Sequence, residues 1–242
     1  EVFALIGGQV VSTSPTLAPM FTWTGVPIAL ALIAYGFIAS VLPVWMLLCP
    51  RDYLSTFMKI GTIVLLAVTI LVVLPELKMP AVTRFVDGSG PVFAGKLFPF
   101  AFITIACGAI SGFHALVASG TTPKMVRREE DARLIGYGGM LMESFVAVMA
   151  ICAASVLDPG VYFAINVPLA KLGGNAGAAA EMIRGWGFAV SPEQMEALAR
   201  EVGEATLWGR AGGAPSLAVG MATLFSGAFG QHLLALWYHF AI

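Results

Sequence analysis

Charged residues are scarce in this sequence. Asp, Glu, Lys and Arg make up 11% of its 242 residues, whereas 58% of the residues are hydrophobic. The mean hydropathy is +0.87, and a soluble domain usually has about 25% charged residues. The composition therefore predicts an integral membrane protein. A formal net charge of −1 leaves no basic surface for a nucleic acid, so we predict no nucleic-acid partner.

Cysteines and enzyme motifs are also scarce. Cys49, Cys107 and Cys152 lie in or beside apolar runs, without a C-x-x-C pair or a Cys/His cluster at metal-ligand spacing. We interpret them as reduced packing residues, because buried free cysteine usually behaves as a small hydrophobic side chain. The motifs H-E-x-x-H and G-x-S-x-G and the P-loop are missing. The sequence thus predicts no enzyme, no cofactor and no metal site.

Long apolar runs dominate what is present. A helix needs about 20 apolar residues to cross the hydrocarbon core of a bilayer. The runs that qualify are 26–48, 55–74, 99–118, 134–156 and 217–242. They predict an all-α membrane protein, a polytopic helical bundle with about five spanning helices in a single transmembrane domain over residues 1–242. Because the sequence begins with Glu1 and stops inside an apolar run, we interpret it as a fragment of a longer protein.

Basic residues indicate the orientation of the spans. The turn at 119–133 contains Lys124, Arg127, Arg128 and Arg133, and the short turn at 49–54 contains Arg51. Two spans separate these turns, so both turns lie on one side of the membrane. Lys and Arg favour the cytoplasmic side in short loops, and we predict that both turns are cytoplasmic.

The segment 157–216 is then extracytoplasmic. Within it, Ser191 is followed by Pro192 and Gln194, a capping-box pattern that predicts an amphipathic helix near 192–204. This helix is expected to lie on the membrane or on the bundle. The fold therefore includes an extracytoplasmic helical segment besides the spans.

The run at 99–118 is interrupted by small and polar residues. Gly108, Ser111 and Gly112 lie within it, and a polar turn with Ser119, Thr121 and Thr122 follows. One interpretation is a small-residue face that packs against another helix. The other is a broken helix that lines a cavity, because backbone groups freed within a bilayer need protein or water as partners. His114 favours the cavity, and we predict that this helix is broken.

Lys59, His114 and Glu143 each lie within a predicted span, and His232 and His239 lie in the last one. Burying such a residue in a membrane costs about 2.5–3.5 kcal/mol, so it indicates function by default. Glu143 is the strongest candidate, and with His114 it could relay a proton. The alternatives are a structural Glu143, paired with Lys59 or hydrogen-bonded to a neighbouring backbone group, a hydrogen-bonded His114 at a helix contact, and a Lys59 that snorkels to the cytoplasmic face. Near the end, "WYHF" at 237–240 is typical of an interfacial aromatic belt.

Several stretches carry a resemblance to a known family. They are "PVWMLLCPRDYLSTFMKIGTI" (43–63), "LFPFAFITIACGAISGFHALVASGTTPKM" (97–125), "IGYGGMLMESFVAVMA" (135–150), "DPGVYFAINVP" (158–168), "RAGGAPSLAVGMA" (210–222) and "WYHFAI" (237–242). The sequence resembles the carbon starvation protein A family of bacterial membrane transporters over nearly its whole length. The resemblance implies secondary active uptake of peptides or pyruvate during carbon starvation, coupled to protons, at the bacterial inner membrane. Members of that family are longer than this chain.

The functional hypothesis joins these observations. The broken helix would line the substrate path, with Glu143 and His114 handling the proton and Lys59 as a possible helper. The residues expected along the path are Gly108, Ser111, Gly112, His114, Ser119, Thr121, Thr122 and Glu143. The partners are then a small-molecule substrate, the coupling proton and the lipid bilayer. An ion channel and a membrane sensor or scaffold that binds through 157–216 stay open as alternatives.

Overall fold

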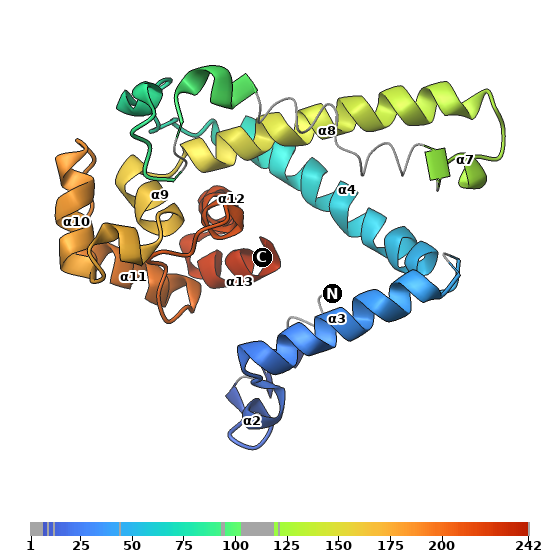
Figure 1. The fold of residues 1–242 in the computed structure, drawn as a ribbon, viewed down its shortest axis with the longest axis horizontal. Helices are drawn as coiled ribbons and strands as arrows, with labels where there is room; N and C mark the ends of the chain where they lie inside the picture. Colours follow the sequence, from blue (N-terminus) through green and yellow to red (C-terminus); the bar gives the residue numbers. More distant parts are fainter. Residues whose placement is uncertain are drawn as a thin grey trace. The chain divides into compact units, whose positions relative to one another are not determined.

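The fold is described from a computed structural model, which covers residues 7–8, 10–11, 13–43, 45–92, 95–102, 119–120 and 122–241. All regular secondary structure in these residues is helical, as predicted (Figure 1). The chain divides into two compact units, Glu1–Leu65 and Leu66–Ile242. Each unit is described separately below.

The first unit contains α2 (Ala18–Phe21), α3 (Gly25–Val41) and the first part of α4 (Leu48–Val73). The apolar run predicted to be helical to residue 48 stops at Val41. Pro43 explains this end, because the residue before a proline is driven to an extended conformation, and Leu42 has φ −71° and ψ 147°.

The start of α4 corrects a second prediction. Residues 49–54 were predicted as a cytoplasmic turn. They are helical and form the first turns of α4, so the prediction of a loop there was wrong. Pro50 is compatible with this position, because the first turn of a helix does not need its backbone N–H. The Arg51 guanidinium donates to the Tyr35 hydroxyl at 2.9 Å and thereby joins α4 to α3.

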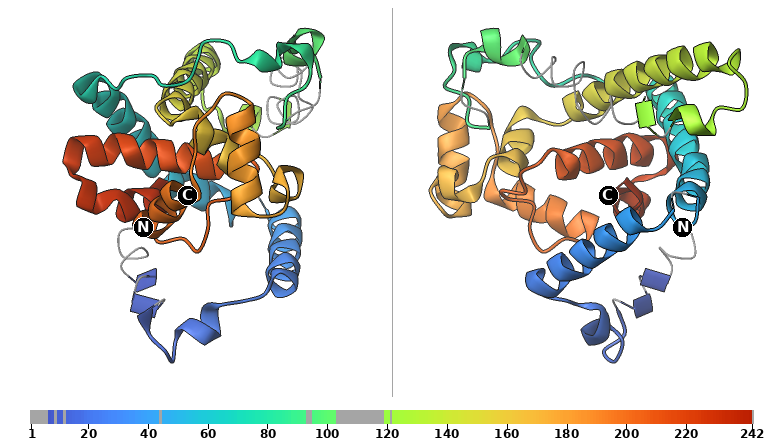
Figure 2. Two further views of the ribbon diagram at one scale, coloured as in Figure 1. Left: turned by 90° about the vertical axis from the view of Figure 1, so that its left-hand side faces the viewer. Right: turned by 45° about the vertical axis from the view of Figure 1, so that its right-hand side comes forward.

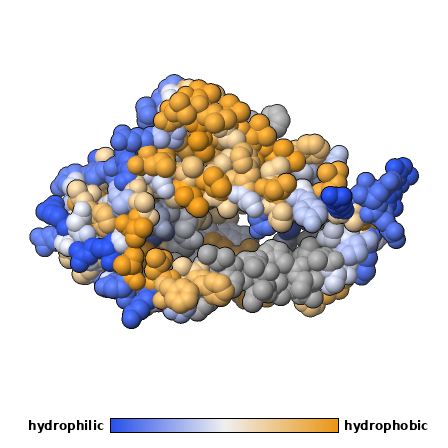
Figure 3. All heavy atoms as spheres, turned by 90° about the horizontal axis from the view of Figure 1, so that it is seen from above, coloured by the Kyte–Doolittle hydropathy of each residue, from blue (hydrophilic) through white to orange (hydrophobic). Residues whose placement is uncertain are grey.

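Two of the described helices have the length and composition to cross a membrane. They are Cys49–Val73 of α4 and Asp131–Ser155, which is α8. Only 11% and 6% of their most apolar windows are buried, so neither is the covered core helix of a soluble domain. Figure 3 shows broad hydrophobic areas at the surface of the face it presents. Apolar surface of this extent is typical of a site of contact with a membrane or with another protein.

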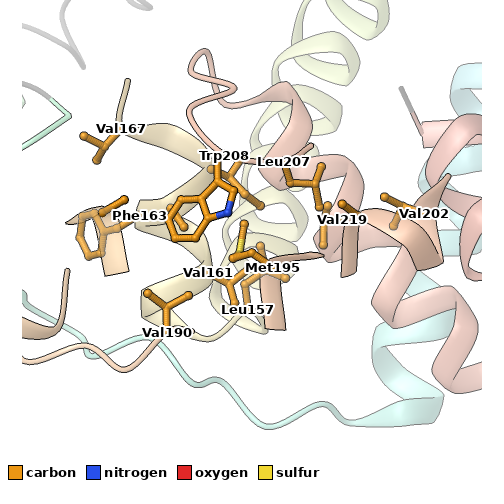
Figure 4. Packing of buried hydrophobic residues seen from close by; sticks show 14 of the residues in the cluster. Leu157, Val161, Phe163, Val167, Val190, Met195, Val202, Leu207, Trp208 and Val219 are labelled. Atoms are coloured by element: carbon orange, nitrogen blue, oxygen red, sulfur yellow. The ribbon is translucent and has the colours of Figure 1, made fainter. Parts of the chain in front are cut away.

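The hydrophobic core lies in the second unit. It is built by α9 (Pro159–Asn166), the 3-10 helix η3 (Leu169–Leu172), α10 (Ala176–Gly185), α11 (Pro192–Val202), α12 (Ala214–Phe229) and α13 (Leu234–Ala241) (Figures 1 and 2). Trp208, Met195 and Phe163 are among its members (Figure 4). The segment 157–216 is therefore a packed helical module that shares one core with α12 and α13.

Side-chain caps define the helices of this module. The Asn175 carboxamide oxygen accepts from the Ala178 backbone N–H at 2.8 Å at the start of α10. The Ser191 hydroxyl accepts from the Gln194 N–H at 3.1 Å at the start of α11, where the capping-box pattern placed a helix. The buried face of α11, Met195, Ala199 and Val202, packs into the protein core. This helix was expected to lie on the membrane or on the helical bundle, and its apolar face packs against the other helices of the protein.

The last apolar run is two helices and not one. α12 ends at Phe229, Gly230 follows with φ +116°, and the 3-10 helix η4 (Gln231–Leu233) leads into α13. Continuous helix over 217–242 was thus a wrong prediction. A side chain at Gly230 would meet the His232 ring, so this break depends on glycine. α12 and α13 then pack against each other, with the Phe225 and Trp237 ring centroids 4.9 Å apart.

α12 also packs closely on α8. A Cβ atom at Gly220 of α12 would collide with the backbone carbonyl oxygen of Ala153 on α8. Both helices are apolar, and small residues allow backbones in such helices to approach each other. Gly220 and Ala153, which is fully buried, therefore fix the position of the hairpin on α8.

Candidate functional site

Glu143 lies near the middle of α8. Its side chain is exposed on an apolar helix of 25 residues, and within the described residues it makes no ion pair. Gly138 and Gly139 precede it with open space around them, and the Ser144 hydroxyl donates back to the Met140 carbonyl oxygen at 3.0 Å. A carboxylate at such a position needs a partner or water from outside this surface.

The polar turn before α8 is described in part. Ser119 is exposed, and Thr122 is the half-buried first residue of the short helix α7 (Thr122–Met125). Beyond α7, the Arg128 guanidinium pairs with Glu130 at 3.4 Å directly before α8 begins. The structure therefore places Lys124, Arg127 and Arg128 ahead of α8, whereas Arg133 lies in its first turn.

Several predicted path residues lie outside the described residues. They are Gly108, Ser111, Gly112, His114 and Thr121. The broken helix over 99–118 and the relay between His114 and Glu143 therefore stay predictions. The helix break that the structure does describe is at Gly230, between α12 and α13.

Lys59 is exposed on α4. Because α4 begins at Leu48, Lys59 lies about three turns into the helix, not one turn as the predicted start at 55 implied. Arg51 and Asp52, paired at 3.1 Å, mark the charged end of α4, and Lys59 is about 10 Å farther along the axis. Lys59 belongs to the first unit and Glu143 to the second, so their pairing stays a prediction.

The aromatic residues near the end of the chain have a structural role. Tyr238 is fully buried, and Trp237 packs against Phe225, Phe229 and Phe240 with centroid distances of 4.9–5.9 Å. An interfacial belt requires side chains that face the membrane surface. The belt was therefore a wrong interpretation for Tyr238, and Trp237 holds the α12–α13 hairpin together.

Glu204 connects the loop after α11 to α13. One carboxylate oxygen lies 2.7 Å from the Arg210 guanidinium, and the other accepts from the Tyr238 hydroxyl at 3.3 Å. The Glu204 carboxylate beside it raises the pKa of Arg210 above its ordinary value. Sequence reasoning missed this group, because its members are far apart in the chain and stand in no recognisable motif.

Replacing Glu204 with Gln should lower the stability of the second unit. The variant loses the ionic part of the Arg210 contact, and partly exposed pairs of this kind contribute about 1 kcal/mol. We expect a lower midpoint of thermal unfolding for the purified full-length protein. Glu181→Gln, an exposed position on α10, is the matched control and should leave the midpoint unchanged. Equal midpoints for Glu204→Gln and wild type would show that the contact adds nothing.

Comparison with known proteins now identifies the family. The family model for carbon starvation protein CstA matches residues 2–242. This chain belongs to the CstA family. It is 60% identical over 245 residues to the peptide transporter CstA of Escherichia coli (strain K12), covering 99% of this chain and 35% of that protein. No solved structure matches the chain.

Two further relatives are similar over the whole chain. The peptide transporter CstA of Helicobacter pylori (strain J99) is 53% identical over 242 residues, which are 100% of this chain and 35% of that protein. The pyruvate/proton symporter BtsT of Escherichia coli (strain K12) is 50% identical over 263 residues, covering 100% of this chain and 37% of that protein. The chain thus spans between 35% and 37% of the length of these relatives.

Proposed function

We propose that this chain is part of a secondary active transporter that takes up small carbon sources, peptides or pyruvate, together with protons. The observation that carries the proposal is high identity over the whole chain to relatives named for these two activities. The apolar helices α4 and α8 support it, because both have the length of a span and expose apolar surface. No nucleic acid takes part, and the lipid bilayer is the environment.

The proposed architecture is a multi-pass bundle in the bacterial inner membrane. α3, α4, the run at 99–118 and α8 are its proposed spans, and the α12–α13 hairpin packs on α8 at Gly220. The turn at 119–133 lies in the cytoplasm in this proposal, and the module 157–216 lies outside.

The proposed path combines the predicted residues with the described ones. Ser119 and Thr122 stand at the cytoplasmic turn, and Glu143 stands in the middle of α8. Glu143 would take up and release the coupling proton, with Lys59 as a possible helper. Gly108, Ser111, Gly112, His114 and Thr121 would complete the path.

Accumulation against a gradient tests this function. The full-length protein in vesicles should concentrate radiolabelled pyruvate or di- and tripeptides when the outside is acidic, and should lose this accumulation when a protonophore is added. A channel would equilibrate the solute and never concentrate it. Binding without movement of the solute would favour a sensor and contradict a transporter.

A further inference from the structure

A pocket of about 260 Å³ opens in the second unit, beside the ends of two helices. Its charged lining is Lys78 in the segment after α4, Asp158 at the start of α9 and Glu201 on α11, and its uncharged polar lining is Gln194 on α11 and Thr223 on α12. Its apolar lining includes Val161 and Val219, both buried in the hydrophobic core. The base of the pocket is therefore apolar and belongs to the packed core, and its rim is charged.

The backbone holds Lys78 at the end of α8. The Lys78 and Met79 backbone N–H groups both donate to the Ser155 carbonyl oxygen, at 2.8 and 3.2 Å. Ser155 is the last residue of α8, whose terminal carbonyl groups lack partners within the helix. A lysine side chain here is also favoured by the negative end of the helix dipole. The backbone of Lys78 is thus fixed at this rim, and its side chain brings a cation there.

Asp158 faces Lys78, and its carboxylate can accept further hydrogen bonds from a ligand. Its carboxylate lies 3.2 Å from the Lys78 ammonium nitrogen. Although Asp158 is the N-cap residue of α9, its side chain makes no capping hydrogen bond. About half of each side chain is exposed, 48% for Lys78 and 46% for Asp158, so a solute can reach both groups.

Glu201 adds a second carboxylate to the lining. It is exposed on α11 and has no ion-pair partner among the described residues. The rim therefore holds two carboxylates and one ammonium group, a net charge of −1. A ligand with both a cationic and an anionic end complements this arrangement, whereas a lone carboxylate meets a net negative rim.

We propose that this pocket binds short peptides through their charged ends. The peptide ammonium group lies between Asp158 and Glu201, the peptide carboxylate lies at Lys78, and the apolar base contacts the side chains. The volume of about 260 Å³ equals that of about nine water molecules at about 30 Å³ each, which gives room for a dipeptide. Pyruvate has no cationic group and binds here much more weakly.

This inference rests on the proposed transport function and deepens it. The pocket is built from segments that the basic residues place outside the membrane, which is the side from which a nutrient arrives. It therefore acts as an entry site that selects peptides before the membrane-spanning path.

Binding of blocked peptides tests the pocket without any mutation. Titration calorimetry on the purified full-length protein compares L-alanyl-L-alanine with its N-acetyl derivative, its C-terminal amide and pyruvate. Each blocked peptide should bind about tenfold more weakly, the loss expected for one hydrogen bond between charged groups. Equal affinities for the free and the N-acetyl peptide would overturn the proposal.

Substitution at Glu201 locates the effect. Glu201→Gln should weaken L-alanyl-L-alanine binding about tenfold and leave binding of the N-acetyl peptide unchanged. Glu196→Gln, on α11 but not among the residues that line this pocket, is the control and should bind both peptides as wild type does. If Glu201→Gln binds the free peptide like wild type while vesicles still accumulate it, the pocket assignment is wrong and transport stands. If wild type binds the peptide but never accumulates it or pyruvate, the transport function is wrong instead.

Discussion

Replacing Glu143 with Gln is expected to reduce pH-driven uptake to the level of protein-free vesicles. The change keeps the shape of the side chain and removes its ability to bind and release a proton. Glu143 is an ionisable residue near the middle of an apolar helix of 25 residues, where a charge costs about 2.5–3.5 kcal/mol. The measurement is uptake of radiolabelled substrate by the full-length protein under an inward proton gradient.

The control for this substitution is Glu130→Gln. Glu130 is the N-cap residue of the same helix, is exposed, and pairs with Arg128 at 3.4 Å. A solvated pair of this kind contributes little, so uptake should stay at the wild-type rate. Exchange of labelled for unlabelled substrate should survive in Glu143→Gln, because exchange needs no net proton movement. Proton-driven uptake that is unchanged in Glu143→Gln would contradict the coupling role.

Replacing Gly220 with Ala is expected to destabilise the protein by about 1–3 kcal/mol, the range for overpacking a tight contact. The added methyl group would collide with the Ala153 carbonyl oxygen on α8, and a backbone atom cannot move aside as a flexible side chain can. α12 must then shift away from α8. The midpoint of thermal unfolding of the purified full-length protein should fall.

Gly227→Ala on the same helix is the matched control. A Cβ atom there would lie 3.7 Å from Val73 Cγ1, an ordinary contact distance. Alanine is the better helix former by about 1 kcal/mol, so this variant should be as stable as wild type or more stable. If both variants shift the midpoint by the same amount, the close approach of α8 and α12 is not a stabilising contact.

Local patterns predicted much of the helical structure. The cap at Ser191 and the apolar face of α11 depend on residues within one or two turns, and the structure has a helix there. The apolar run at 134–156 likewise coincides with α8, which begins three residues earlier at Asp131. Such signals are available in the sequence because helix formation is governed by near neighbours.

The wrong predictions have a common physical cause. Hydropathy measures how apolar a run is and not whether its backbone turns, so 217–242 was predicted as one span. The turn at Gly230 depends on a single residue with φ +116°. For the same reason, hydropathy extended the first predicted span over 42–48, although Pro43 ends α3. Hydropathy also cannot separate a lipid-facing aromatic from one buried by a neighbouring helix, as for Tyr238.

Groups from distant parts of the chain were not predictable. Lys78 and Asp158 are 80 residues apart, and Tyr238 reaches Glu204 across 34 residues. An aspartate before a helix is common as a cap, and the sequence offers no sign of another role for Asp158. The structure shows that its side chain pairs with Lys78 and makes no capping hydrogen bond.

Proton movement driven by substrate tests the central claim most directly. The full-length protein is placed in vesicles without an imposed gradient, with a pH-sensitive dye inside, and pyruvate or L-alanyl-L-alanine is added outside. The account predicts that the interior becomes more acidic in wild-type vesicles, because each substrate enters with a proton, and that Glu143→Gln vesicles show no change. Entry of labelled substrate into wild-type vesicles without any change in interior pH would contradict proton-coupled uptake.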